Sequence, residues 1–392
     1  MDYISQANTN IAFRAKPIPL NILNRTKSEL LNNKVVNVDI YCHSSADEDT
    51  INSAKVFADW LTAKGKKVNI CAPESEVKDL YINTKKYNLK HSNNIPDKSV
   101  VLDFNAEERL SDKYKDLFYK NKQENIIGYD HHTPTVSKLK GDFYVDDSAK
   151  SCCGILTRFF DGLGIKLPKE ARKSLYCGMV SDYKKSGLLK LTSDNGIYKL
   201  TKTDKLLEDK NSLEVFDKLD SSLTKEEKNK IYKHLDPLSR LNHDEKLLRK
   251  RVFSQLQVSP NGKMAYVVIP PEDALWKKVG MDTPKTSEIL KDLRVRVSEN
   301  SQNVSMLSDE QKNKMKNVDT VVAFYRKGDE YRMSIHSRSN SAIKLIDYIK
   351  ENLNPNIIAG GHADRAGGKI DSVNEKDTMK FVNDFVKASE IL

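Results

Sequence analysis

Short apolar runs alternate with helix-like stretches between residues 34 and 200. Apolar residues recur at helical spacing over 51–61, and the runs that read as strands cover 35–42, 68–71, 100–102 and 126–129. This alternation is typical of a parallel sheet whose strands are joined by crossover helices. The sequence therefore predicts an α/β fold here, with functional residues at the carboxyl ends of the strands.

The length of 392 residues exceeds what one hydrophobic core usually accommodates. After residue 200 the chain becomes densely charged, and a second region of strand and helix signals follows. We therefore predict an N-terminal extension, an α/β catalytic domain with a parallel sheet, a charged helical linker and a smaller mixed α/β C-terminal domain. These parts cover residues 1–33, 34–200, 201–255 and 256–392.

Composition narrows the class of protein. No apolar run approaches the ~20 residues of a membrane-spanning helix, so we expect no membrane association, and we expect no signal peptide. The five cysteines form no C-x-x-C pair, which indicates a reducing, cytoplasmic compartment and small core residues instead of catalytic thiols. The net charge of +10 favours anionic partners, although solvated helix faces explain it equally well.

The first predicted strand runs into His43, Asp47 and Asp49. Alternation along an extended segment places the three side chains on one side, where an imidazole and two carboxylates can hold a cation. Acidic residues at a helix N-terminus look similar, so this cluster alone is a weak signal.

Further acidic and imidazole side chains end other apolar runs. Asp103 follows the strand at 100–102 and precedes Arg109, and the adjacent residues Asp130, His131 and His132 follow the strand at 126–129. A fourth run ends at Asp182. Asp103 and Asp182 taken singly have ordinary structural explanations, whereas a buried structural role for both His131 and His132 is hard to justify. Four such positions in one chain indicate a shared site.

Taken in their order along the chain, these acidic and imidazole residues resemble the motifs of the DHH family of phosphoesterases. The segment Gly360-Gly361-His362 is similar to the Gly-Gly-His loop of the DHH-associated C-terminal domain. The pattern most resembles the stand-alone oligoribonuclease and phosphoadenosine-phosphate phosphatase group, and the loop argues against family II pyrophosphatases. The resemblance covers residues 34–392 and implies an active-site cleft between the two domains.

The chain departs from the family pattern at a few positions. Ala46 stands where the family usually has proline and Thr50 where it has alanine, but neither is a ligand. The family's Ser-x-Arg-Ser segment corresponds to residues 334–339, in which either Arg338 or His336 takes the arginine position. We favour Arg338 because a guanidinium binds phosphate oxygens through two hydrogen bonds.

Carboxylates gathered in one site repel each other unless a cation neutralises them. Oxygen-rich ligation with two imidazoles favours two divalent ions, Mn²⁺ ahead of Mg²⁺. The resemblance implies that one ion takes His43, Asp47 and Asp103, and that the other takes Asp49, Asp103, His131 and Asp182. It assigns His132 to contact with substrate phosphate or with a ligand, and Asp130 to orienting a neighbour. Asp103, Asp130, His131 and His132 form the catalytic set.

The resemblance also implies how substrate binds. Arg338 or His336, together with His362, would hold phosphate oxygens; the backbone of Gly360 and Gly361 would approach phosphate, and Arg109 would assist. The expected reaction is hydrolysis of short oligonucleotides or small nucleotides by hydroxide held between the ions. Alternatives are an exonuclease on longer single strands, a cyclic-dinucleotide phosphodiesterase and a non-enzymatic nucleotide-binding regulator. A homodimer is compatible with the family; cleavage polarity and the choice of RNA or DNA stay open.

Overall fold

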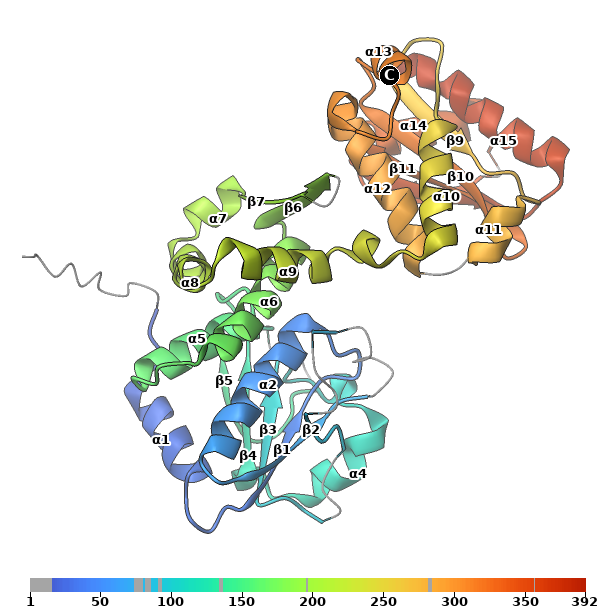
Figure 1. Cartoon of the computed structure of the whole chain (residues 1–392). Coiled ribbons are helices and arrows are strands. Elements are labelled where there is room, and N and C mark those ends of the chain that lie inside the picture. Colours follow the sequence, from blue (N-terminus) through green and yellow to red (C-terminus); the bar gives the residue numbers. More distant parts are fainter. Residues whose placement is uncertain are drawn as a thin grey trace, which may run out of the picture. The chain divides into compact units, whose positions relative to one another are not determined.

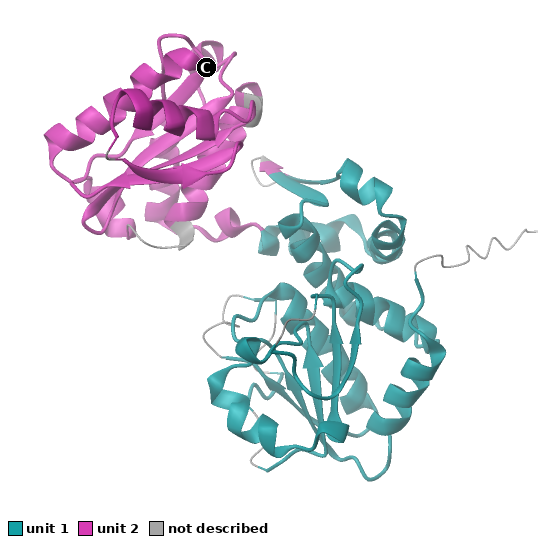
Figure 2. Ribbon diagram, turned by 180° about the vertical axis from the view of Figure 1, so that it is seen from behind, with its two compact units in different colours: residues 1–192, 198–235 teal, residues 193–197, 236–392 magenta. Residues whose placement is uncertain are grey.

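The chain forms two compact units (Figures 1 and 2). The computed structural model describes residues 16–73, 80–81, 86–90, 94–133, 137–194, 197–280, 284–355 and 357–392. Unit 1 comprises residues 1–192 and 198–235, and unit 2 comprises residues 193–197 and 236–392.

Unit 1 is built on a five-stranded sheet in which every pairing is parallel, with strand order β2-β1-β3-β4-β5. The strands are β1 (Asn37–Tyr41), β2 (Lys67–Cys71), β3 (Lys98–Leu102), β4 (Ile126–Asp130) and β5 (Asp142–Val145). The parallel sheet predicted from the apolar runs is therefore confirmed, and β5 is a strand that the run pattern did not indicate. All five carboxyl ends lie at one edge of the sheet.

Helices cover both faces of this sheet (Figure 1). They are α1 (Leu20–Leu30), α2 (Glu48–Ala63), α4 (Asp112–Lys120), α5 (Cys152–Gly162) and α6 (Lys169–Lys185). Val38 and Ile40 of β1 face the core shared with α1, α2, α5 and α6. Tyr41, one residue on, points to the other face and packs on α4, with its ring 4.9 Å from that of Phe118. This alternation is that of a strand buried on both faces.

The described residues before position 34, and part of the segment after position 200, belong to unit 1. Leu23 and Leu30 of α1 are buried in its core, and the Thr26 hydroxyl lies 2.7 Å from the Tyr129 hydroxyl of β4. Residues 1–33 are thus not a separate extension where the structure describes them. A β-hairpin and three helices complete the unit: β6 (Leu189–Asp194), β7 (Ile197–Lys202), α7 (Asp204–Glu208), α8 (Lys210–Ser221) and α9 (Lys225–Leu235).

Residues 201–255, expected as one charged linker, divide between the two units. Val215, Phe216 and Ile231 are buried in the core of unit 1, so α8 and α9 belong to that unit. From Asp236 the chain belongs to unit 2. The charged residues lie on the outer faces of these helices, and the apolar residues between them decide the packing.

Unit 2 contains a six-stranded mixed sheet with order β12-β13-β11-β10-β9-β8. The pair β9–β10 is parallel and the other pairs are antiparallel. The strands are β8 (Gln257–Val258), β9 (Met264–Val268), β10 (Thr320–Lys327), β11 (Glu330–Ser337), β12 (Ile358–Gly361) and β13 (Arg365–Ile370). This confirms the smaller mixed α/β fold predicted for the C-terminal part.

Two clusters of buried residues lie on the two faces of this second sheet. Val321 and Ala323 of β10 pack into the first cluster, and Val322 and Phe324 pack into the second. The helices are α10 (His243–Ser254), α11 (Ala274–Val279), α12 (Pro284–Asn300), α13 (Asp309–Lys314), α14 (Ala342–Asn352) and α15 (Glu375–Ala388).

Two further observations bear on the earlier expectations. Within the described ranges, no helix combines the length and the apolar character needed to cross a bilayer. All five cysteines are free and buried: Cys42, Cys71, Cys152, Cys153 and Cys177.

Candidate metal centre

The loop after β1 brings the first acidic cluster to the carboxyl edge of the sheet. His43 is buried, and the Asp47 side chain is the N-cap of α2. Asp47 Oδ1 accepts the backbone N–H groups of Asp49 and Thr50, each at 3.1 Å. Capping of the helix therefore orients the Asp47 carboxylate. The same side chain can act both as the N-cap of α2 and as a metal ligand.

Asp103 follows β3 and is the central residue of the cluster. It is 1% exposed and has a φ of 70°, a left-handed conformation that is uncommon outside glycine. The hydroxyl of Thr50 donates a hydrogen bond to its Oδ2. Backbone strain of this kind is retained where the surroundings hold the residue in place, and it is enriched at functional sites.

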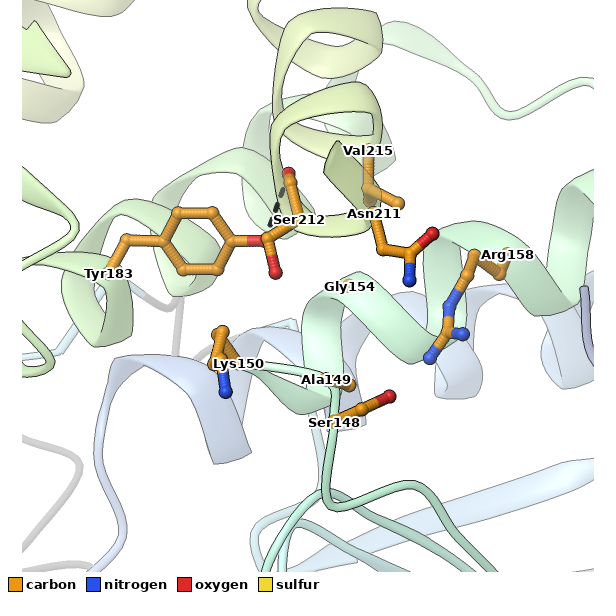
Figure 3. Close-up of a pocket in the computed structure, with 9 residues that line it drawn as sticks. All are labelled: Ser148, Ala149, Lys150, Gly154, Arg158, Tyr183, Asn211, Ser212 and Val215. Atoms are coloured by element: carbon orange, nitrogen blue, oxygen red, sulfur yellow. Dashed lines mark hydrogen bonds between the residues drawn. The ribbon is translucent and has the colours of Figure 1, made fainter. Parts of the chain in front are cut away.

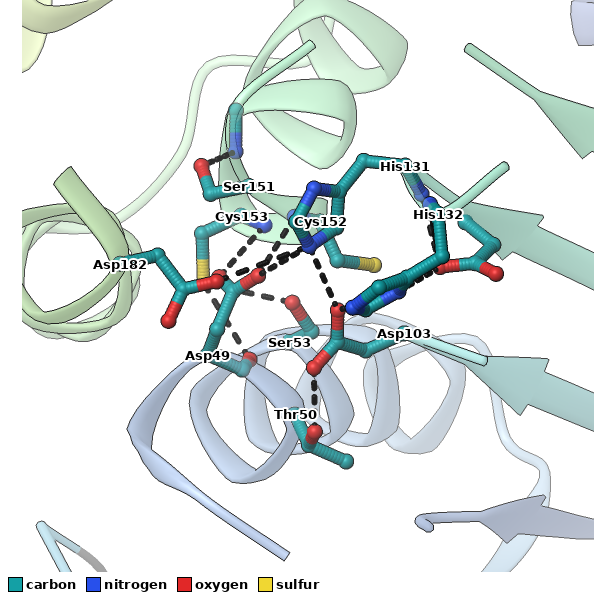
Figure 4. Close-up of polar contacts among 12 residues, drawn as sticks. Asp49, Thr50, Ser53, Asp103, His131, His132, Ser151, Cys152, Cys153 and Asp182 are labelled. Atoms are coloured by element: carbon teal, nitrogen blue, oxygen red, sulfur yellow. Dashed lines mark hydrogen bonds and ion pairs between the residues drawn. The ribbon is translucent and has the colours of Figure 1, made fainter. Parts of the chain in front are cut away.

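His131 follows β4 and points its Nε2 into the cluster (Figure 4). This atom lies 3.1 Å from Asp103 Oδ1, 3.5 Å from Asp182 Oδ2 and 3.8 Å from Asp49 Oδ2. The imidazole is thus surrounded by three carboxylates. The ligand atoms of Asp49, His131 and Asp182 lie close enough together to hold one cation.

His43 and Asp103 define a second group of ligand atoms. His43 Nε2 lies 3.6 Å from Asp103 Oδ2 and 3.8 Å from Asp47 Oδ1. These three residues also form a group that could hold a cation. Because Asp103 turns Oδ2 toward His43 and Oδ1 toward His131, its carboxylate joins the two groups.

Asp49 is held by the N-terminus of α5. Its two carboxylate oxygens accept the backbone N–H groups of Cys152 at 2.5 Å and Cys153 at 2.9 Å (Figure 4). The first N–H groups of a helix lack partners within the helix and attract negative charge. These contacts stabilise the Asp49 carboxylate in a side chain that is fully buried.

Asp182 comes from a helix, not from a strand end. It lies in the last turn of α6, which packs directly against the start of α2. Gly178 makes this approach possible, because a Cβ there would lie 2.4 Å from Cys153 Sγ and 3.0 Å from the Glu48 carbonyl oxygen. The apolar run before Asp182 is therefore a buried helix face, which a short apolar run does not distinguish from a strand.

Burial and mutual repulsion change the proton affinity of the carboxyls. Burial, with repulsion from Asp103, raises the pKa of Asp182 to about 6 and that of Asp49 well above its ordinary value. Burial also acts to raise the pKa values of Asp47 and Asp103, but His43 and Lys185 outweigh it at Asp47, and His131 and His43 outweigh it at Asp103. The pKa of Asp47 falls to about 2, and that of Asp103 falls well below its ordinary value.

The pKa values of the two imidazoles, His43 and His131, are both raised. Burial acts to lower the pKa of His131, but the carboxylates of Asp103, Asp49 and Asp182 raise it to about 9. The pKa of His43 is also raised against the effect of burial, by Asp103 and Asp47. The cluster as it stands thus takes up protons to balance its negative charge, which a bound dication would do instead.

Lys185 supplies a further positive charge. Its Nζ lies 2.8 Å from Asp182 Oδ1 and also pairs with Asp47 Oδ2. Lys185 follows Asp182 by three residues, so both side chains project from the same side of α6. No sequence pattern pointed to Lys185, although it follows Asp182 at helical spacing.

Buried polar atoms that lack a hydrogen-bond partner indicate whether a cation fits this cluster. Among the described residues, His43 Nε2, His131 Nε2 and Asp103 Oδ1 are buried and make no hydrogen bond of acceptable geometry. Buried polar atoms are rarely left without partners, and here all three belong to the two ligand groups. The donor set of oxygen and imidazole nitrogen suits Mn²⁺ or Mg²⁺.

Asp130 and His132 lie beside this cluster in a different arrangement. Asp130 Oδ1 accepts the backbone N–H of His131 at 2.7 Å and lies 2.7 Å from His132 Nδ1. Its Oδ2 accepts the Asn105 amide at 2.5 Å. The Asp130 carboxylate is therefore occupied in shaping the loop, while the His132 side chain remains 40% exposed.

Of the other predicted substrate-binding residues, Arg109 lies beside the loop that carries His43, and the rest belong to unit 2. Arg109 ends a short 3-10 helix (Glu107–Arg109), and its carbonyl accepts the Ser44 N–H at 2.7 Å. His336 belongs to β11, where its Nδ1 lies 2.8 Å from the Ser298 hydroxyl, and Arg338 is exposed just after that strand.

The predicted glycine loop is the hairpin between β12 and β13 of unit 2. Gly361 has a φ of 154°, and a Cβ there would lie 2.5 Å from the Arg365 carbonyl oxygen. His362 is exposed in the turn, and its N–H donates to Arg365 O at 2.7 Å. Gly360 has open space where a side chain would stand. The hairpin thus presents backbone and imidazole at a surface.

A small cavity near α5 does not extend this site (Figure 3). It measures about 20 Å³ and is lined by residues that include Arg158, Tyr183 and Ser212. Arg158 is held by Asp146, at 2.7 Å. A volume of this size holds about one water molecule, so the cavity cannot take a nucleotide.

A parallel α/β sheet with carboxylates and imidazoles gathered at its carboxyl edge defines a metal-dependent hydrolase. Residues 37–179 match the model of the DHH family, N-terminal domain. These residues therefore form a DHH-family N-terminal domain, and the family consists of metal-dependent phosphoesterases. No curated protein sequence matches it.

The chain is similar to solved structures to different degrees. An exopolyphosphatase-related protein from Bacteroides fragilis is 18% identical, with a TM-score of 0.53, and the match covers 95% of this chain and 98% of that one. RecJ from Thermus thermophilus in complex with Mn²⁺ is 14% identical, with a TM-score of 0.38, covering 96% of this chain and 56% of that one. The likeness to the exopolyphosphatase-related protein shows a shared fold.

Proposed function

We propose that the protein hydrolyses phosphoester bonds in short oligonucleotides or small nucleotides, with two divalent ions in the cluster around Asp103. One ion would be held by His43, Asp47 and Asp103, and the other by Asp49, Asp103, His131 and Asp182. The observation that carries the proposal is the convergence of the three unpartnered atoms, His43 Nε2, His131 Nε2 and Asp103 Oδ1.

The chain's own residues perform the positioning. Asp103 is locked by its backbone conformation and by Thr50, Asp47 by the N-terminus of α2, and Asp49 by the N-terminus of α5. Divalent ions held there would supply Lewis-acid stabilisation of phosphoryl charge and an ionised water at neutral pH. Rigid ligands keep this arrangement constant through the reaction, which favours catalysis.

His132 is our candidate for contact with substrate phosphate. Its Nδ1 faces Asp130, so the imidazole has a defined orientation while much of the side chain is open to solvent. An imidazolium oriented by a carboxylate through one nitrogen donates a hydrogen bond to a phosphate oxygen from the other nitrogen. Asp130 in this proposal is a positioning residue, since both of its oxygens are already engaged.

Unit 2 is proposed to supply the remaining phosphate contacts, through Arg338 or His336 and through the Gly360-Gly361-His362 hairpin. The exposed turn and the close backbone approach at Gly361 support this role. N–H groups that no side chain covers are well suited to bind phosphate oxygens. We propose Mn²⁺ as the preferred ion, a short nucleotide as substrate, a cytoplasmic location and no role for a membrane.

The test is a product profile with purified, metal-free protein reconstituted with Mn²⁺ or Mg²⁺. Linear and cyclic dinucleotides, 3′-phosphoadenosine 5′-phosphate and a long single strand would be offered separately. We expect kcat/KM to be highest for substrates of about two to four nucleotides, with mild salt dependence, because few phosphates are contacted. Asp103→Asn, prepared in parallel, controls for contaminating nucleases.

Other outcomes would redirect the proposal. Faster and strongly salt-dependent degradation of the long strand would assign an exonuclease that follows a backbone. Turnover of only the cyclic dinucleotide would assign a cyclic-dinucleotide phosphodiesterase. Metal and nucleotide binding without turnover of any substrate would assign a regulatory protein.

A further inference from the structure

A second group of metal-ligating side chains lies outside the cluster around Asp103. Glu48, Cys177 and His234 come from α2, α6 and α9, and their ligand atoms all lie within 4.8 Å of one another. Neither the sequence patterns nor the family assignment gives these residues a role. We propose that they form an additional divalent-cation site of the zinc type, separate from the predicted catalytic ions.

The contacts among the three residues support a shared ligand. Cys177 Sγ lies 3.8 Å from Glu48 Oε2, and His234 Nε2 pairs with Glu48 Oε1. Zinc bonds of about 2.0–2.3 Å place neighbouring ligand atoms about 3.3–3.8 Å apart. Cys177 Sγ and Glu48 Oε2 are already at this separation, while His234 lies against the other oxygen, Oε1, and would have to move away from it to share one ion.

The chemistry of the three donors favours a borderline-soft cation. A thiolate, an imidazole and a carboxylate together match the donors that Zn²⁺ takes in proteins. Two negative charges and a neutral imidazole balance one dication, so the occupied site carries no net charge. The cluster around Asp103 differs in kind, because the ligand groups found there contain no cysteine.

Neighbouring residues hold Glu48 in position by hydrogen bonds, and the nearby Lys55 ammonium is bound elsewhere. The Tyr81 N–H donates to both Glu48 oxygens, at 3.2 and 3.1 Å, and the Asn52 amide donates to Oε2 at 3.0 Å. Lys55 Nζ donates instead to Asn52 Oδ1 at 3.1 Å and to the Tyr81 carbonyl. Glu48 is thus fixed by neighbouring residues as metal-bound carboxylates commonly are.

Burial and access are compatible with ion entry. Cys177 is fully buried and Glu48 is 7% exposed, while His234 lines a cavity of about 450 Å³ together with Lys55 and Tyr81. His234 is therefore the residue at the entrance, and a water molecule from the cavity can take the fourth position. Tetrahedral zinc with three protein ligands and one water is a common arrangement.

The position of the site indicates what it does. Glu48 lies between Asp47 and Asp49 on α2, and Cys177 lies five residues before Asp182 on α6. A cation bound by Glu48, Cys177 and His234 would connect α9, the last helix of unit 1, to α2 and α6. These two helices carry ligands of the predicted catalytic ions. We therefore assign it a structural role that stabilises the packing of α2 against α6.

Cobalt substitution tests this site without relying on activity. The metal-free full chain would be titrated with Co²⁺ while the near-ultraviolet spectrum is recorded, because only a thiolate ligand produces a sulfur-to-cobalt charge-transfer band. We expect such a band in the wild type, with the intensity of one thiolate-bound Co²⁺ once excess Co²⁺ has filled every site, and its loss in Cys177→Ser. Cys71→Ser, which removes another buried thiol, should retain the band.

A second variant and elemental analysis keep the result interpretable. His234→Gln replaces the least buried ligand, so it tests the site if Cys177→Ser fails to fold. Both variants should bind one zinc equivalent less than the wild type. A wild-type spectrum without the band would overturn the proposal, and so would a band that persists in Cys177→Ser. Asp103→Asn should keep the band, which separates failure of this site from failure of the proposed function.

Discussion

His131 and Asp103 face each other across the carboxyl ends of β4 and β3, with Nε2 of the imidazole 3.1 Å from Oδ1 of the carboxylate. Both atoms are buried, and neither makes a well-formed hydrogen bond within the described residues. Each residue follows its strand directly, so the register of the two parallel strands brings the two side chains together. A cation between them would satisfy both atoms.

Asp103→Asn should remove the proposed shared ligand while preserving the fold. Asparagine tolerates the left-handed backbone conformation at this position almost as well as aspartate. Loss of a residue that only orients a metal ligand lowers activity by up to about a hundredfold. Loss of a shared ligand should therefore lower turnover by more than about a hundredfold. Metal content should fall too, with circular dichroism unchanged. Full metal content and activity in this variant would contradict the assignment of Asp103.

Lys185→Met should strengthen metal binding. The lysine occupies Asp47 and Asp182 as a competing cation, and the methionine keeps its apolar stem. Because the side chain is 54% exposed, the ion pairs are worth no more than about 1 kcal/mol, or about fivefold in Mn²⁺ affinity by calorimetry. Lys173→Met, on the same helix and paired with Glu170, is the matched control. Weaker binding in Lys185→Met would mean that the lysine supports the metal-loaded state.

Metal affinity should rise with pH. A metal ligand must lose its proton, and in the metal-free protein the pKa of His131 is about 9 and that of Asp182 about 6. Affinity for Mn²⁺ should therefore increase from pH 6 to pH 9, measured at each pH by calorimetry. His131→Asn should flatten the upper part of this profile. A profile independent of pH in the wild type would contradict the proton competition.

The same histidine predicts how the metal-free protein responds to pH. Its folded-state pKa is raised from 6.5 to about 9, so the folded state binds this proton more tightly than the unfolded state does. The resulting stability is fully present below pH 6.5 and is lost as pH rises through 9. The Tm of metal-free protein should fall over this range, whereas saturating metal should reverse the trend. A Tm that rises instead would mean that another group dominates.

Gly178→Ala should disturb the packing of α6 on α2. The added Cβ would meet Cys153 Sγ and the Glu48 carbonyl oxygen, and the second of these is backbone that cannot rotate away. We expect a loss of about 1–3 kcal/mol in the free energy of unfolding, together with lower metal content, because Asp182 moves with the helix. Gly360→Ala has open space around its Cβ and should leave stability unchanged.

Arg338→Ala should weaken substrate binding without changing metal content. A charge-assisted contact to phosphate is worth about 1.5–3 kcal/mol, which corresponds to at least a tenfold rise in KM or fall in kcat/KM. His336→Ala removes the contact with the Ser298 hydroxyl and serves as the comparison. If His336→Ala is damaging and Arg338→Ala has no effect, His336 takes the arginine position of the family segment.

The sequence determined much of the fold and most members of the cluster. Apolar runs that end in His43, Asp103 and Asp130-His131 predict strands of a parallel sheet, and such strands bring their carboxyl ends to one edge. The proximity of these residues was therefore predictable from local pattern alone. Asp182 was identified as well, but its place on α6 was not, since a short apolar run fits either a strand or a buried helix.

Only the tertiary structure decided what surrounds these residues. The Asp49 carboxylate lies on the N–H groups of Cys152 and Cys153 because α5 docks end-on, and no periodicity in the sequence encodes that contact. Glu48 meets residues that are 129 and 186 positions away, Cys177 and His234. Such encounters depend on how helices pack over the sheet, which is set by the summed burial of many side chains and not by any local pattern.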